Sequence, residues 1–171
     1  MNIPETCDYL VRGRRDLWAT LKSAPDELLS RPLLDGSRFH CIKDIAMHLP
    51  DVEGGWTRGE ILRDQMVQKD FSALMNTEGG PVYAEFPLEM LLDYWRAVEQ
   101  STLAYLATLT DDELKRLVSM LDWPEEQHTV DELLWHVMIH EMRQTAQIAL
   151  LLRSQGIKPP ALDRLNCLPS A

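Results

Sequence analysis

The chain has 171 residues, which suits one domain with a sizeable core. Its content of 45% hydrophobic and 26% charged residues is ordinary for a soluble globular protein. The formal net charge of −10 argues against a nucleic-acid partner, because the phosphate backbone would repel it. No apolar run approaches the roughly 18 residues that a membrane-spanning helix needs, so a membrane partner is not expected either.

Cysteine usage indicates a reducing compartment. Cys7, Cys41 and Cys167 are scattered along the chain without a Cys-x-x-Cys pair, which fits free thiols better than a disulfide framework. The first residues lack the basic and apolar regions of a secretory signal. We therefore expect a cytoplasmic protein.

The first helix is expected over residues 4–22, where Pro4 suits the first turn. Its candidate core positions are Leu10, Val11, Leu17 and Leu21. The basic run at residues 12–15 is short, and we interpret it as a solvated face of this helix. Residues 23–32 then predict a turn with a short helical piece.

Two further helices flank an irregular connection. The first is expected over residues 38–66, with Pro50 as a candidate kink. Residues 65–85 have the least regular pattern and predict a long connection that crosses the end of the molecule. The next helix should cover residues 87–109, with proline at its first position.

Two capping boxes mark the remaining helices. Residues 110–113 fit one at the start of a short helix to residue 120, which a loop at 123–128 follows. Residues 129–132 fit the second, at the start of a long helix that Gly156 closes as a C-terminal cap.

The pattern as a whole favours an all-α fold, because no alternation of useful length predicts a β-strand. Four main helices with two long connections predict a four-helix bundle with long crossover connections. We expect a single domain over residues 1–171, with its core at about 4–156 and an extended tail at 157–171.

The last helix carries the best candidate site. His136, His140 and Gln144 follow one another at intervals of four residues, which places them on one flank of a helix. His140 and Gln144 fall inside the apolar stripe of this helix. Polar groups in such a stripe need partners once they are buried, and a metal ion would explain two of them together.

His48, at the edge of the apolar face of the second helix, is the candidate ligand from that side. Three ligands from two helices would leave coordination positions open, as in catalytic metal sites. Other interpretations stay open. Either histidine could be an ordinary hydrogen-bonded residue, and His136 could be a ligand or a surface residue. Gln144 is a poor metal ligand and could be a buried amide bonded to neighbouring helices.

Glu141 and Asp51 are the candidate catalytic carboxylates. The run from His140 to Gln144 is one histidine short of the His-Glu-x-x-His signature of zinc proteases. Glu141 could still approach a metal-bound water, or it could bond the backbone of a neighbouring helix. Asp51 follows His48 by three residues and could orient that imidazole or be a solvated helix charge.

These residues together give a resemblance to a known family. The segments that carry it are Ile45-Ala-Met-His48, Asp51, Trp56, Leu134-Trp-His136, His140-Glu141, Gln147, Leu152-Arg153 and Gly156-Ile-Lys-Pro-Pro160. On these segments the chain resembles the DinB/YfiT-like family of helical-bundle metalloproteins, from about residue 10 to residue 160.

The resemblance implies a divalent metal, such as Zn, Ni or Fe, held by His48, His140 and Gln144, with His136 as the alternative third ligand. The family usually has histidine where this chain has Gln144. It further implies a metal-dependent enzyme, a thiol S-transferase or a hydrolase, with a low-molecular-weight thiol as a partner, and a homodimer. The alternative is a metal-free helical interaction or dimerisation module whose site has degenerated at Gln144.

Overall fold

A computed structural model describes residues 2–33, 36, 39–75 and 83–163, and helices dominate this part of the chain. The four long ones are α1 (Ile3–Ser23), α3 (Ile42–Gly54), α5 (Leu88–Leu106) and α7 (Val130–Ser154). The prediction of an all-α fold is confirmed. Within the described ranges, no helix is long and apolar enough to cross a membrane.

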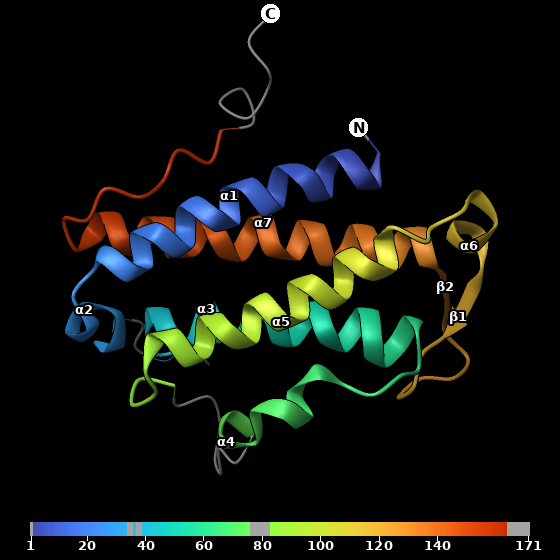
Figure 1. Cartoon of the computed structure of the whole chain (residues 1–171), viewed down its shortest axis with the longest axis horizontal. Coiled ribbons are helices and arrows are strands. Elements are labelled where there is room, and N and C mark those ends of the chain that lie inside the picture. Colours follow the sequence, from blue (N-terminus) through green and yellow to red (C-terminus); the bar gives the residue numbers. More distant parts are fainter. Residues whose placement is uncertain (1, 34–35, 37–38, 76–82, 164–171) are drawn as a thin grey trace, which may run out of the picture.

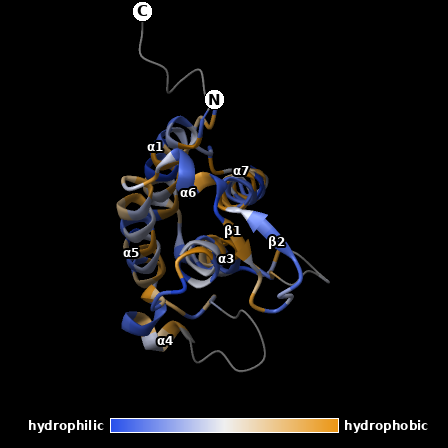
Figure 2. Cartoon of the chain, turned by 90° about the vertical axis from the view of Figure 1, so that its right-hand side faces the viewer, coloured by the Kyte–Doolittle hydropathy of each residue, from blue (hydrophilic) through white to orange (hydrophobic). Residues whose placement is uncertain are grey.

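The four long helices form a bundle. Helices α1 and α7 run in one direction, whereas α3 and α5 run in the other (Figure 1). Both α1 and α3 pack against α5 and α7, and a view close to the bundle axis shows the four helices around a common centre (Figure 2). Every long helix therefore has an apolar side to bury and two neighbours against which to bury it.

The parallel direction of α3 and α5 explains the long connection between them. Helix α3 continues as a π-helical segment, η1 (Gly55–Ile61), before the 3-10 turn η2 (Val67–Phe71) and the short α4 (Ser72–Met75). The 3-10 turn η2 and α4 return along the bundle (Figure 1), so the prediction of a connection that crosses the end of the molecule was wrong. Residues 76–82 of that connection lie outside the described residues.

Short elements complete the two ends. They are α2 (Asp26–Ser30), α6 (Asp111–Lys115), β1 (Leu117–Ser119) and β2 (Gln127–Thr129). The two strands pair in antiparallel fashion, with Val118 opposite His128. The predictions of a helix to residue 120 and of a loop through residue 128 were therefore wrong. Strands of three residues are too short to show the two-residue alternation that predicts a strand.

Capping explains where several of the helices begin. The box of Thr129 and Glu132 opens α7, and Gly156 ends it with a φ of 78°, as predicted. Helix α3 begins at Ile42 rather than near residue 38, because the Asp44 carboxylate accepts hydrogen bonds from the backbone N–H groups just before it. Helix α5 ends three residues earlier than predicted, and proline is its N-cap rather than its first residue.

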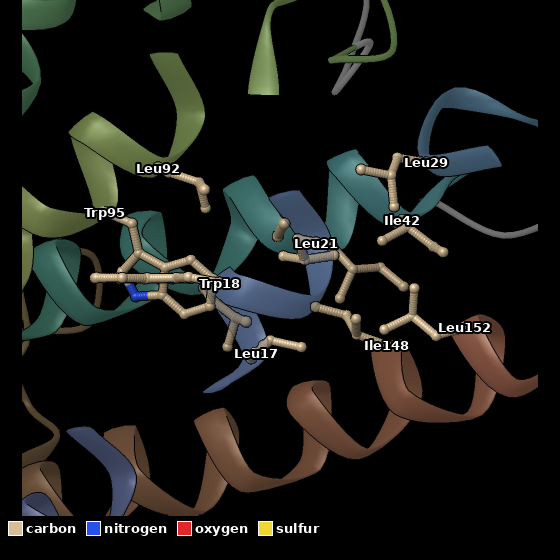
Figure 3. Packing of buried hydrophobic residues seen from close by; sticks show 12 residues of the cluster. Leu17, Trp18, Leu21, Leu29, Ile42, Leu92, Trp95, Ile148 and Leu152 are labelled. Atoms are coloured by element: carbon tan, nitrogen blue, oxygen red, sulfur yellow. The ribbon is translucent and has the colours of Figure 1, made fainter. Parts of the chain in front are cut away.

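Aromatic residues occupy the middle of the core. Trp18 and Trp95 meet edge to face with ring centroids 5.5 Å apart (Figure 3). Around them lie the other buried members of this cluster: Leu17, Leu21, Leu29, Ile42, Ile45, Ala46, Leu49, Leu92, Ile148 and Leu152. Of the positions predicted for the first helix, Val11 is only half-buried, because it lies beside the stripe that faces the other helices.

The chain returns to its first helix after α7. Residues 157–163 have no regular secondary structure, and residues 164–171 lie outside the described ranges. The Tyr9 hydroxyl donates a hydrogen bond to the backbone oxygen of Leu162, so this segment lies against α1.

Candidate metal centre

The imidazoles of His48 and His140 meet between α3 and α7. Their Nε2 atoms lie 3.1 Å apart, and their ring centroids are 4.9 Å apart with an interplanar angle of 76°. Both side chains are half-buried. The apolar faces of two helices thus bring together the two histidines that the sequence singles out.

Gln144 stands one turn further along α7. Its side chain is 5% exposed, and its Nε2 lies 3.5 Å from His140 Nε2. Within the described ranges, its Oε1 is buried without a hydrogen-bond partner. A half-turn of the amide would exchange the two atoms and direct the oxygen toward the imidazoles. A buried carbonyl oxygen without a donor is unfavourable, and a cation would satisfy it.

His136 lies at the outer edge of this group and is exposed. Its ring stacks on His140 at a centroid distance of 6.4 Å and meets Trp56 edge-on at 4.8 Å. On the other side, Phe39 packs against His48 at 4.5 Å. The Phe39 and His136 rings therefore flank the imidazole pair on its two sides.

Burial and a neighbouring positive charge favour the neutral form of the His140 ring. Burial lowers its pKa below the ordinary value, and the positive charge of Arg143 lowers it further. The same two causes lower the pKa of His136. Metal ions bind neutral imidazole, so a lowered pKa favours ligation near neutral pH.

The residues present fit a divalent cation. Two nitrogens bound to one ion at about 2.1 Å would lie roughly 3.0–3.4 Å apart, and the observed separation of 3.1 Å falls in this range. In the part of the chain that the structure describes, no group of three or more His, Cys, Asp or Glu side chains could hold a metal. The third donor would therefore be the Gln144 amide.

The two candidate carboxylates accept hydrogen bonds from other elements of the fold. Asp51 accepts hydrogen bonds from Gln68 Nε2 at 2.8 Å and from the Tyr94 hydroxyl at 3.1 Å. Glu141 accepts two from Arg14 rather than bonding a backbone group, at 2.9 Å from Nε and 2.6 Å from Nη2. Both carboxylates therefore have structural partners on other elements of the fold.

Arg14 is the residue that the sequence reasoning misplaced. It is 5% exposed, although the basic run at residues 12–15 was predicted to be a solvated face. Arg12 and Arg15 are exposed as expected. The available signal was spacing, because Arg14 falls between Leu10 and Leu17 on the buried stripe of α1.

Three buried glutamates surround Arg14. Besides Glu141, it contacts Glu99 at 3.0 Å and Glu53 at 3.1 Å, and Arg15 also pairs with Glu99. Burial opposes the charge on Arg14, but the carboxylates, Glu141 foremost, raise its pKa above the ordinary value. Burial raises the pKa of Glu53, and the charge of Arg14 offsets only part of this effect.

The described thiols are not activated. Burial raises the pKa of Cys7 to about 12 and that of Cys41 to about 11. The thiolate is the reactive form, so neither side chain is a nucleophile near neutral pH. Both are free cysteines, and Cys167 lies outside the described residues.

A comparison with protein-family models identifies the family. The model described as DinB family matches residues 1–170. The chain belongs to the DinB family. No curated protein matches it closely enough to count as a relative. Membership agrees with the all-α architecture of this DinB chain and suggests a metal-associated helical protein, while it names neither a substrate nor a reaction.

Proposed function

We propose that this DinB protein is a divalent-metal-dependent enzyme whose ion is held by His48, His140 and Gln144. The observation that supports this most directly is the 3.1 Å approach of the two Nε2 atoms beside the buried, unpartnered Gln144 Oε1. When bound, a Zn, Ni or Fe ion would act as a Lewis acid that lowers the pKa of a thiol or of water. Among the described residues, His136 does not form a group with His48 and His140 that could hold a metal, so Gln144 is the preferred third ligand.

The reaction proposed is thiol S-transfer or hydrolysis. The raised pKa values of Cys7 and Cys41 keep both thiols protonated near neutral pH, so neither would supply a thiolate, and we propose an external low-molecular-weight thiol for an S-transfer. The role of the chain is then to hold the metal ion and to orient its ligands. Phe39 packs on His48 and His136 stacks on His140, so both rings would limit rotation of the ligand imidazoles. We propose a cytoplasmic location, in keeping with the free thiols.

Metal analysis tests this proposal. Protein purified without a histidine tag should contain about one equivalent of metal, and His140→Ala should lose it. His128 is the matched control, since it lies on β2 with 45% of its side chain exposed, so His128→Ala should retain the metal. Equal metal content in wild type and His140→Ala would reject the proposal.

A second candidate function is a metal-free interaction module that forms a homodimer. Two observations favour it: the third position is an amide rather than an imidazole, and Ile139 and Leu150 on α7 are 56% and 62% exposed. This alternative predicts a melting temperature that does not respond to metal, tolerance of His48→Ala, and a dimer in sedimentation that Ile139→Glu dissociates.

A further inference from the structure

All four long helices meet at one buried cluster of charges. Arg14 comes from α1, Glu53 from α3, Glu99 from α5 and Glu141 from α7. All four residues are at most 6% exposed. The guanidinium donates two hydrogen bonds to Glu141 and one to Glu99, and its Nη2 lies 3.1 Å from Glu53 Oε2. It thereby connects the other three helices through one rigid group.

The cluster connects the same two helices as the imidazole pair. Glu141 directly follows His140 on α7, and neighbouring side chains on a helix point about 100° apart. Glu141 therefore faces Arg14 while His140 faces α3. On α3, Glu53 follows His48 by five residues. Besides their apolar packing, helices α3 and α7 thus have two polar connections, a direct one through the imidazoles and an indirect one through Arg14.

Such a connection restricts how α7 can slide or rotate. Moving a helix by one residue shifts its side chains by about 1.5 Å and 100°, which a forked guanidinium–carboxylate pair does not tolerate. Apolar side chains would accommodate smaller shifts by repacking. Buried ion pairs often add little net stability, whereas they can specify one arrangement over another.

We propose that Arg14 is a positioning residue for the metal centre. Its hydrogen bonds to Glu141, together with its contact with Glu53, set the register of α7 against α3 and so hold His140 at coordination distance from His48. The effect of Arg14 on metal affinity rests on the proposed function. Its effect on the geometry of the imidazole pair does not require a bound metal.

The test compares Arg14→Lys with Lys43→Met. Arg14→Lys keeps the charge and loses the fork. Lys43 is the control because it is also a buried cation, 1% exposed, five residues before His48, and its Nζ binds the backbone oxygens of Ala84 and Phe86. Both variants should lower the melting temperature, so stability alone does not distinguish them.

Two readouts separate positioning from stability. Long-range ¹H–¹⁵N spectra of the metal-free protein report the tautomers of His48 and His140, and competition with a chromophoric chelator reports the Kd for Zn²⁺. Arg14→Lys should replace the single tautomer of each ring by a mixture and weaken Zn²⁺ binding at least tenfold. Lys43→Met should leave the spectra and the Kd within twofold of wild type.

The inference is overturned if Arg14→Lys leaves both readouts at wild-type values, or if Lys43→Met changes them equally. Should Arg14→Lys not fold, Glu141→Gln takes its place, since it keeps the side-chain shape and removes half of the fork. If wild type binds no Zn²⁺, the proposed function fails, and the histidine spectra alone decide the inference.

Discussion

His140 Nε2 lies 3.1 Å from His48 Nε2, a hydrogen-bond distance at which one ring nitrogen carries the proton and the other accepts it. A cation would replace that shared proton, because a nitrogen that binds a metal cannot also carry hydrogen. Proton and metal therefore compete for the same pair of atoms.

Gln144→His should strengthen metal binding at least tenfold, because imidazole is a better ligand for Zn²⁺ than an amide oxygen. Gln144→Leu, of similar size but without a donor atom, should weaken it. Chelator competition measures both. A Kd that is unchanged in both variants would show that this position does not contact the ion.

Glu53 should make stability fall as the pH rises. Its pKa is raised in the folded protein, chiefly by burial, so the folded state binds this proton more tightly than the unfolded chain does. The resulting stabilisation is complete below the ordinary value of 4.5 and is lost as the pH rises through the raised pKa.

The measurement is urea denaturation of wild type and Glu53→Gln across this range. Glu53→Gln should flatten the decline in the free energy of unfolding, which for one proton is at most about 1.4 kcal/mol per pH unit. Parallel pH profiles of the two proteins would contradict the expectation.

Asp44→Ala should lower the free energy of unfolding by about 2 kcal/mol, because it removes a helix cap and leaves buried N–H groups unpaired. The carboxylate accepts from the backbone N–H groups of His40, Cys41 and Tyr83. Hydrogen exchange should accelerate at these three amides. Asp16→Ala, at an exposed position on α1, should change neither quantity.

Cys7 and Cys41 should resist alkylation in the folded protein. In a Cys167→Ser variant they are the remaining thiols. With pKa values of about 12 and about 11, both should react with iodoacetamide about a hundredfold or more slowly than in denaturant at the same mildly alkaline pH. Comparable rates in the two states would mean that one thiol is activated.

Local sequence signals made the long helices predictable. The features that were missed depend on a distant contact or on strands too short to show a pattern. The capping box of Thr129 and Glu132 lies within four residues, so α7 could be located from the sequence. The start of α3 depends on Asp44, whose carboxylate also accepts from distant Tyr83. The β1–β2 hairpin has only three residues per strand, too few for a period to appear.

The residues of the candidate site were likewise predictable only where a local pattern marks them. His140 and Gln144 stand out because polar groups within an apolar stripe are conspicuous, and His48 is conspicuous for the same reason on α3. Arg14 is not, because a charge in a basic run usually stays in water. It becomes buried only because three other helices each supply a glutamate, and no local pattern reveals partners so far away in the chain.

The hydrogen bond from Tyr9 to Leu162 bears on how the protein can be handled. It holds the end of the described chain against α1, whereas the two imidazoles lie between α3 and α7. A fluorophore or fusion partner attached just after Leu162 would therefore start beside the first helix rather than between α3 and α7.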